Sequence, residues 1–332
     1  MKKLIIGVIV SFFAMYSQAG TLDSVKANGK LRCGVAGGLP GFSAPNSLGR
    51  MEGLDADTCR AVAAAVFGDA EKVNFVPLTA KERFTALSSG EIDILSRNTT
   101  WTATRDNSLG LNFAGINYYD GQGFLAKKEL GVKSARELDG ASVCVQAGTT
   151  TELNLADYFD TNGMKYKGIA FDTSPETRKA FDAGRCDVLT SDASQLAAIR
   201  TGLKNPNGAI ILPEVISKEP LGPVVAQGDD QWFNIVKWTM FALVNAEELG
   251  VTSKNIHSSS DNKSINRLLG RSGSYGEQLG LDNKWAFNII SKIGNYGEMF
   301  DRNVGKDSPL QLPRGVNQLW NKGGIMYAPP IR

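Results

Sequence analysis

Two stretches of the chain, 94 residues apart, share one pattern. Residues 86–96 read "ALSSGEIDILS" and residues 180–190 read "AFDAGRCDVLT". Each gives a helix end, a glycine, two further residues, an aspartate and an apolar strand, so that Gly90 matches Gly184 and Asp93 matches Asp187. A repeated strand-and-helix unit limits the fold to two related lobes, each built around its own sheet.

The surrounding sequence alternates between strand and helix patterns. Apolar strands such as "LRCGVA", "VNFVPL", "SVCVQA" and "KGIAF" are separated by amphipathic stretches such as "DADTCRAVAAAVF" and "TELNLADYF". In "SPETRKAFDAG", Ser174 is expected to cap a helix with Pro175 at its first position. Such alternation predicts an α/β fold in which mainly parallel strands are joined by crossover helices.

Residues 1–19 have the pattern of a secretory signal. Lys2 and Lys3 precede an apolar run that is too short to span a bilayer, and small residues surround a cleavage site at Ala19. We therefore expect a free, exported protein. Without Lys2 and Lys3 the formal net charge falls from +2 to 0, which makes neither nucleic acid nor an anionic membrane surface an obvious partner.

Export makes the four cysteines candidates for disulfide bonds. Three pairings are possible, and four free buried thiols are the alternative. Cys33 and Cys59 fall in one half of the early chain and Cys144 and Cys186 in another, which favours one bridge in each lobe.

The candidate binding residues follow the matched strands. Asn98 and Asp192 each lie five residues beyond the matched aspartates, and Arg105 follows Asn98 by seven residues. Ligands gather at the carboxyl ends of parallel strands, so one lobe offers a cation and the other an anion. A guanidinium suits a carboxylate, and hydroxyls such as that of Thr100 add neutral donors. This asymmetry predicts a zwitterionic ligand.

The second lobe offers a helix start in "QAGTTTELNL". Thr149 and Thr150 lie where free backbone N–H groups favour an anion, so a ligand carboxylate is expected between Arg105 and Thr150. Ordinary structural roles compete with these assignments. Arg105 would otherwise form a surface salt bridge, Asp192 would cap the following helix, and Thr149 and Thr150 would be plain helix caps.

The ordered set of motifs resembles periplasmic amino-acid-binding proteins of ABC transporters, which are two-lobed and close on their ligand like a flytrap. The resemblance rests on "GLDADTCRAV", "TWTATR", "VQAGTT" and "CDVLTSD"; the tail from "GRSGSYGEQLGLDNKW" to "NQLWNKGGIMYAPP" is similar to the subgroup that takes up general L-amino acids.

The resemblance implies roles for single residues. The α-carboxylate would lie on Arg105, Thr100 and the backbone near Thr150, and the α-ammonium on Asp192 beside Asn98. Phe42 would form a pocket wall. Ala36 and Leu39 stand where relatives selective for basic amino acids have an acid and an aromatic lid, which argues against a cationic side chain and agrees with broad specificity.

The domain limits are expected at 20–122 plus 228–332 for the first lobe and 123–227 for the second. Hinge segments are expected near residues 121–127 and 223–228. The tail is expected to pack on the first lobe, with Trp285, Phe287, Tyr296 and Trp320 as core.

The predicted function is capture of free L-amino acids by lobe closure in the periplasm and delivery to an ABC permease, by a monomer that needs no cofactor or metal. The alternative is a periplasmic cyclohexadienyl dehydratase acting on prephenate or arogenate on the same fold. No glycine-rich phosphate loop, nucleophile elbow or zinc spacing occurs, and no catalytic residue is assigned.

Overall fold

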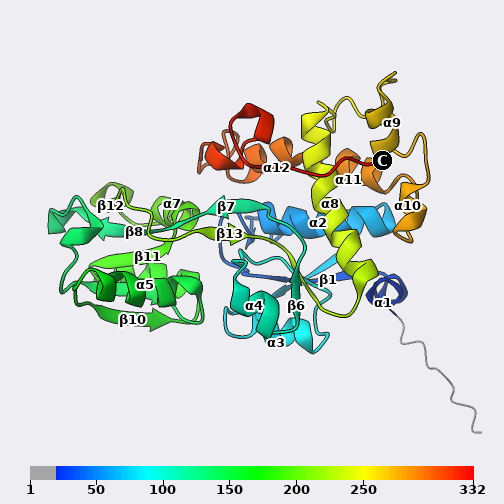
Figure 1. Cartoon of the computed structure of the whole chain (residues 1–332). Coiled ribbons are helices and arrows are strands. Elements are labelled where there is room, and N and C mark those ends of the chain that lie inside the picture. The colour runs from blue at the N-terminus through cyan, green and yellow to red at the C-terminus, as the bar shows by residue number, and fades with distance from the viewer. Residues whose placement is uncertain (1–19) are drawn as a thin grey trace, which may run out of the picture.

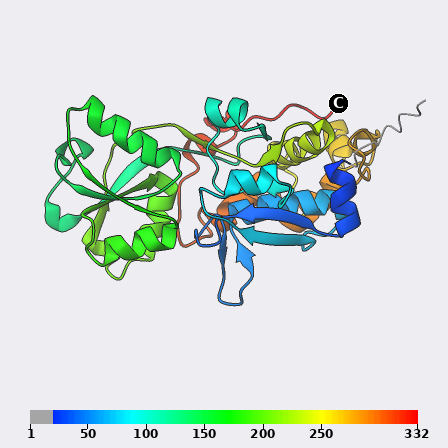
Figure 2. The same ribbon diagram turned by 90° about the horizontal axis from the view of Figure 1, so that it is seen from below.

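The protein has two lobes connected by two adjacent strands (Figure 1). This computed structural model describes residues 20–332, so the expected signal segment, residues 1–19, lies outside the described residues. Figure 2 shows the lobes side by side, with the blue and cyan early chain in one and the green middle of the chain in the other.

The first lobe contains a five-stranded sheet of order β4-β1-β5-β14-β6. Its strands are β1 (Leu31–Val35), β4 (Val73–Pro77), β5 (Ile94–Leu95), β6 (Leu111–Phe113) and β14 (Val224–Ala226). β14 is antiparallel to both of its neighbours, whereas the β1 pairs with β4 and β5 are parallel. Four of the five strands therefore run in one direction.

The second lobe repeats this plan in the order β10-β9-β11-β8-β12. Its strands are β8 (Gln122–Lys127), β9 (Ser142–Gln146), β10 (Lys167–Phe171), β11 (Val188–Asp192) and β12 (Ala209–Ile211). Here β8 is the strand that runs against the others. The predicted pair of mainly parallel α/β lobes is confirmed.

Helices flank both sheets, as the amphipathic patterns predict. In the first lobe these are α1 (Thr21–Asn28), α2 (Leu54–Phe67), α3 (Arg83–Ser88) and α4 (Ala103–Ser108). In the second they are α5 (Thr150–Thr161), α6 (Ser174–Asp182) and α7 (Ala193–Thr201), with the short 3-10 turns η1 (Lys128–Leu130), η2 (Ala135–Glu137) and η3 (Pro206–Gly208). The predicted cap of α6 is wrong by one residue: Thr173 is the N-cap, because its hydroxyl and Glu176 form a reciprocal capping box.

The crossing strands are β7 (Tyr118–Asp120) and β13 (Glu219–Leu221), which pair antiparallel. Each is followed by the reversed strand of the lobe that it enters, β8 or β14. The limit predicted at residue 227 is therefore too late, because β14 already belongs to the first sheet. A small hairpin of β2 (Ala44–Pro45) and β3 (Met51–Glu52) projects from the first lobe (Figure 2).

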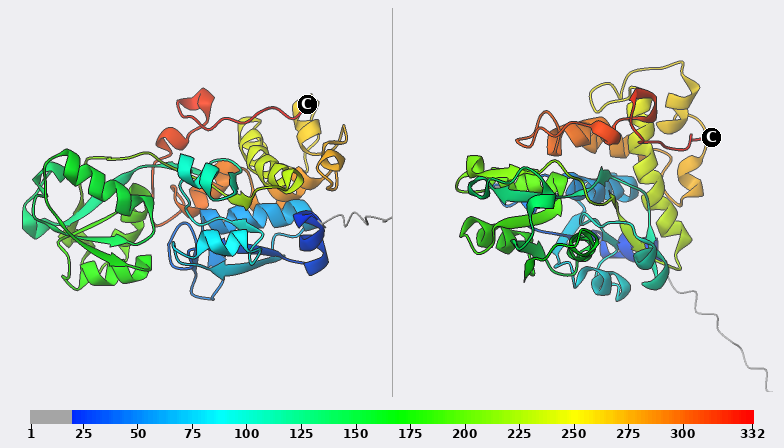
Figure 3. Two further views of the ribbon diagram at one scale, coloured as in Figure 1. Left: turned by 60° about the horizontal axis from the view of Figure 1, so that its bottom comes forward. Right: turned by 60° about the vertical axis from the view of Figure 1, so that its left-hand side comes forward.

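The rest of the chain packs on the first lobe, as Figure 3 shows for the yellow to red segments. It forms α8 (Asp230–Glu248), α9 (Lys263–Leu268), α10 (Tyr275–Gln278), α11 (Trp285–Ile293), α12 (Tyr296–Asn303) and the turns η4 (Gly315–Asn317) and η5 (Trp320–Lys322). Trp285 and Tyr296 are buried, and Phe287 packs against the same core. The expectation for Trp320 is wrong, since half of its surface is exposed.

Both expected disulfide bonds are present, Cys33–Cys59 in the first lobe and Cys144–Cys186 in the second. Cys33 of β1 is joined to Cys59 of α2, and Cys144 of β9 is joined to Cys186, which precedes β11. Each bridge stays within one lobe, so neither crosses the hinge. Over residues 20–332, no helix combines the length and hydropathy needed to cross a lipid bilayer.

Candidate functional site

The two lobes touch along the cleft between them. Lys81 of the first lobe and Asp172 of the second form an ion pair with a nitrogen–oxygen distance of 2.8 Å. Gly148, in the turn before α5, has a positive φ of 74°, and a Cβ there would lie only 2.9 Å from Cγ of Lys81. A glycine therefore permits this close approach of the lobes.

Arg105 lies in α4 on the first-lobe side of the cleft and is 92% buried, with 8% of its surface exposed. Its Nη1 donates to the carbonyl oxygen of Thr100 at 2.9 Å, and its guanidinium lies over the Phe84 ring. Burial lowers the pKa of Arg105 to about 10, opposed by the charges of Glu219 and Asp192. The side chain remains a cation at neutral pH, and among residues 20–332 it does not form the surface salt bridge considered for it.

Asp192 ends β11 in the second lobe and is buried. It occupies the N-cap position of α7, but its side chain makes no capping bond. Instead Oδ2 accepts from Nε2 of Gln195 at 2.6 Å, while Oδ1 is buried without a partner among the described residues. Burial and the charges of Asp120 and Glu219 raise the pKa of Asp192 well above its usual value.

Arg105 and Asp192 face the same region without pairing directly. Each shifts the pKa of the other through its charge, yet the described residues contain no ion pair between them within 4 Å. A buried anion with a free oxygen is costly unless a cation or donor meets it. The pair is therefore suited to a ligand that supplies an ammonium group on one side and a carboxylate on the other.

Asn98 lies near Asp192 and lines a pocket between the lobes. Its φ of 36° places it in the left-handed region, which asparagine tolerates better than most residues. Its backbone N–H donates to Asp55 Oδ2 at 2.7 Å, and the nearby Asn98 side chain lowers the pKa of Asp192 against the larger opposite effect of burial.

The start of α5 adds donors. The hydroxyl of Thr149 accepts from the backbone N–H of Glu152, so Thr149 is a helix cap, as its ordinary role predicts. The backbone N–H groups of Thr150 and Thr151 have no acceptor among the described residues. These two groups at the positive end of a twelve-residue helix can receive an anion.

Glu219 is a site residue that the sequence did not reveal. It lies in the crossing strand β13, is buried, and its Oε2 accepts from the hydroxyls of Thr100 at 2.6 Å and Thr150 at 2.8 Å. Oε1 accepts from Asn154 and Ser217. The Thr100 hydroxyl, which is expected to bind the ligand carboxylate, is thus already bonded to a carboxylate of the protein, as is the Thr150 hydroxyl.

The pocket-wall role that the resemblance implies for Phe42 stays a prediction. Phe42 is fully buried in the first-lobe core and packs edge-on against Tyr118, with 5.6 Å between ring centroids. One pocket between the lobes is lined by Ala36 and Leu39, together with Asn98 and Gln195. Neither Arg105 nor Asp192 lines this pocket, and both are buried.

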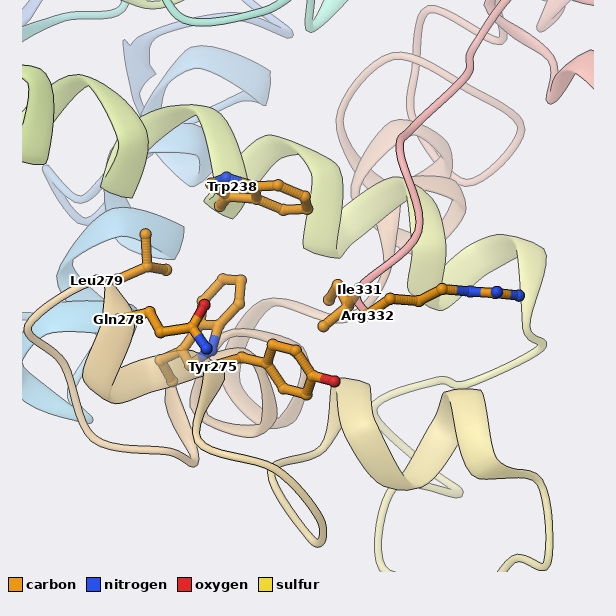
Figure 4. Close-up of a pocket in the computed structure, with 7 residues that line it drawn as sticks. Trp238, Tyr275, Gln278, Leu279, Ile331 and Arg332 are labelled. Carbon is orange, nitrogen blue, oxygen red and sulfur yellow. The ribbon is translucent and has the colours of Figure 1, made fainter.

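A second pocket lies in the C-terminal part of the chain and is separate from the cleft. Figure 4 shows it between α8, α10 and the C-terminus, with the aromatic side chains of Trp238 and Tyr275 in its lining and Arg332 at its edge. Trp285 also lines it. None of the predicted site residues contributes to it. In residues 20–332, no group of three or more His, Cys, Asp or Glu side chains is placed to hold a metal ion.

The chain matches known binding proteins over nearly its whole length. Residues 31–256 match the model of the bacterial extracellular solute-binding proteins, family 3. The general L-amino acid-binding periplasmic protein AapJ of Rhizobium johnstonii is 58% identical, over 98% of this chain and 96% of that protein. The glutamate/glutamine/aspartate/asparagine-binding protein BztA of Rhodobacter capsulatus is 52% identical, over 98% and 97%.

A solved structure is similarly close. A periplasmic binding protein from Brucella ovis with glutathione bound is 56% identical and superimposes with a TM-score of 0.92, covering 95% of this chain and 100% of that one.

Proposed function

Because the chain belongs to the bacterial extracellular solute-binding proteins of family 3, we propose that it captures free L-amino acids between its lobes and delivers them to the permease of an ABC transporter. The observation that carries this proposal is the buried pair of Arg105 and Asp192. They come from different lobes and face one region without neutralising each other.

In this proposal the α-carboxylate of the ligand binds Arg105 and the N–H groups at the start of α5, near Thr150. The α-ammonium binds Asp192, whose Oδ1 is buried without a partner among residues 20–332, with Asn98 beside it. Both ligand charges must be matched, because an unpaired buried ion costs several kcal/mol. Thr100 and Thr150 would then act through Glu219, which fixes their hydroxyls, or turn toward the ligand when it enters.

Binding is coupled to movement of the lobes about β7 and β13. The charged pair is buried, so a ligand enters when the lobes separate and is enclosed when they close. Only a ligand that binds the closed form more tightly can shift the equilibrium toward it. A micromolar ligand provides about 8 kcal/mol at the standard state, part of which offsets the cost of closing.

Broad specificity follows if the α-amino and α-carboxyl groups drive closure. AapJ and BztA are named for ranges of amino acids, which supports this breadth. The glutathione in the Brucella ovis structure supports a second ligand class, because the γ-glutamyl end of glutathione carries the same free α-amino and α-carboxyl groups.

The proposal also covers the cellular location of the protein, its assembly state and the absence of catalysis. The relatives named periplasmic support delivery to the periplasm through cleavage near residue 19. We propose that the mature protein acts as a monomer that docks to membrane subunits. The relatives are named as binding proteins, which supports binding without catalysis. Incubation with prephenate or arogenate should give no ultraviolet change from phenylpyruvate or phenylalanine formation.

A thermal-shift screen tests the binding proposal. Folded protein should be stabilised by several L-amino acids and by glutathione, in the order of their affinities. D-enantiomers should have little effect because their ammonium group is misplaced. N-acetyl derivatives should have little effect because acetylation removes the ammonium group. Lack of stabilisation by every L-amino acid and by glutathione would refute the proposed ligand class.

A further inference from the structure

We infer that Arg97 selects among ligand side chains, favouring those that end in a carboxylate or carboxamide over those that end in a cation. This inference rests on the proposed function, since it concerns the part of an amino acid beyond its α-carbon. Neither the sequence motifs nor the proposed site for the α-amino and α-carboxyl groups assigns a role in specificity to Arg97.

Arg97 lies next to Asn98, directly after β5, and is buried. Its Nε donates to the carbonyl oxygen of Leu78 at 2.9 Å, which fixes the orientation of the guanidinium. Over residues 20–332 no carboxylate lies within 4 Å of this guanidinium, and its terminal nitrogens Nη1 and Nη2 donate to no protein acceptor. These two nitrogens are not among the fully enclosed atoms that lack partners, so a small part of their surface faces accessible space, although Arg97 as a whole is only 3% exposed.

That space is the pocket between the lobes. Arg97 lines it together with Asn98 and Gln195, the residues that hold or flank the Asp192 carboxylate. The pocket therefore continues from the proposed ammonium site toward the rim, along the path that a ligand side chain would take. Gln146 and Thr173 of the second lobe add polar groups, and no acidic side chain lines it.

The charge of Arg97 is incompletely matched by the protein. Asp55 is the acid that acts on it, but the oxygens of Asp55 accept from the Asn98 backbone, Ser96 and Asn117. Arg105 adds repulsion, and burial lowers the pKa of Arg97 to about 10, so the guanidinium is still charged at neutral pH.

A side-chain carboxylate would pair with Arg97 with little competition from water, and a carboxamide oxygen would accept from it. A lysine or arginine side chain would meet a like charge at the same place. Glutamate, glutamine, aspartate and asparagine are therefore the expected preferred ligands, with small neutral amino acids weaker and basic ones weakest.

Isothermal titration of the whole mature chain with glutamate, glutamine, alanine and lysine tests this inference. Wild type should bind glutamate at least 10-fold more tightly than lysine. Arg97→Gln should weaken glutamate binding by 10-fold or more, change alanine binding by less than 3-fold and narrow the gap to lysine. Arg97→Lys, which keeps a cation, should retain part of the preference for glutamate.

Arg83→Gln is the matched control, because Arg83 is equally buried near the cleft but does not line the pocket. Its effect on the four ligands should be uniform. Equal losses for glutamate and alanine in Arg97→Gln, or tighter binding of lysine than glutamate by wild type, would overturn the inference. If wild type bound none of the four, the proposed function itself would fail, whereas uniform binding by wild type and variant would reject only the role of Arg97.

Discussion

Oε2 of Glu219 accepts a hydrogen bond from the hydroxyl of Thr100 at 2.6 Å, although the two residues are 119 positions apart. The same oxygen accepts from Thr150 of the second lobe at 2.8 Å. One carboxylate on a crossing strand therefore joins the two lobes at the inner end of the cleft. The negative charge of Glu219 also raises the pKa of Arg105, which opposes the lowering caused by burial.

Replacing Glu219 should weaken ligand binding by loosening the closed form. Glu219→Ala leaves the buried donors of Thr100, Thr150 and Asn154 without their acceptor, and we expect a loss of about 1.5–3 kcal/mol in binding free energy. Calorimetry with a preferred ligand measures the loss. Glu219→Gln keeps one carbonyl acceptor and should be intermediate; unchanged affinity in both variants would show that the connection does not contribute to closure.

Arg105→Ala should weaken amino-acid binding by about 3–5 kcal/mol, because the α-carboxylate is then buried without its cation. Arg105→Lys keeps the charge but loses the planar fork and should lie between wild type and the alanine variant. Titration calorimetry measures both. A loss below about 1 kcal/mol in Arg105→Ala would place the carboxylate elsewhere, while Lys81→Ala, at the exposed rim, should have little effect.

Asp192→Asn should reduce affinity by a comparable amount while the protein stays folded. The amide has nearly the same shape but cannot neutralise the ligand ammonium. Affinities for an amino acid and for its N-acetyl derivative, measured on both proteins, separate the effect. If the variant discriminated between them as strongly as wild type, another group would hold the ammonium.

The stability of the protein should carry a pH-dependent contribution from Asp120. This carboxylate ends β7, accepts from the backbone of Gly121 and from Ser194, and burial raises its pKa to about 6. A raised carboxyl pKa means that the folded state binds the proton more tightly than the unfolded state. Its contribution therefore becomes less favourable as pH rises from about 4 to about 6, and is constant above that range.

The difference in unfolding free energy between wild type and Asp120→Asn isolates this contribution from other titrating groups. We expect the advantage of wild type to fall by on the order of 2 kcal/mol between pH 4 and pH 6.5. Urea unfolding at a series of pH values measures it. A difference that stayed flat would show that the pKa of Asp120 is not shifted by folding, and one that rose with pH would show that folding lowers it.

Removing the second-lobe disulfide should lower stability without abolishing binding. Cys144 and Cys186 are 42 positions apart, and opening a loop of this size costs about 3–4 kcal/mol. The double serine variant should show this loss in denaturant unfolding. The Cys33–Cys59 double variant, with a separation of 26, should lose a similar amount of stability. A loss below about 1 kcal/mol in either variant would show that its disulfide contributes little to stability.

The site was only partly predictable from sequence. Asn98, Arg105 and Asp192 follow strands whose apolar pattern is strong, and strand ends define a common edge of a sheet. Glu219 and Arg97 carried no such signal. Glu219 lies in the short crossing strand β13, and its partners Thr100 and Thr150 come from other parts of the chain. Arg97 precedes Asn98, but only the packing around Leu78 directs its guanidinium into the pocket.

The different exposure of Phe42 and Trp320 could not be predicted from sequence either. Both are large aromatic residues in segments without regular periodicity, and one is fully buried in the core while the other is half exposed. Hydrophobicity predicts that such residues prefer burial, but it does not say which neighbours will cover them.

The sequence alone determined the two α/β lobes, the disulfide preference and the opposite charges at matching strand ends, because periodicity and chain order are local properties. Only the tertiary structure decided which residues meet across the cleft. It brought Glu219 to the threonines, left one oxygen of Asp192 without a partner in the described chain and turned Arg97 toward the pocket. Such contacts depend on how the chain returns through the hinge, and no local pattern encodes that path.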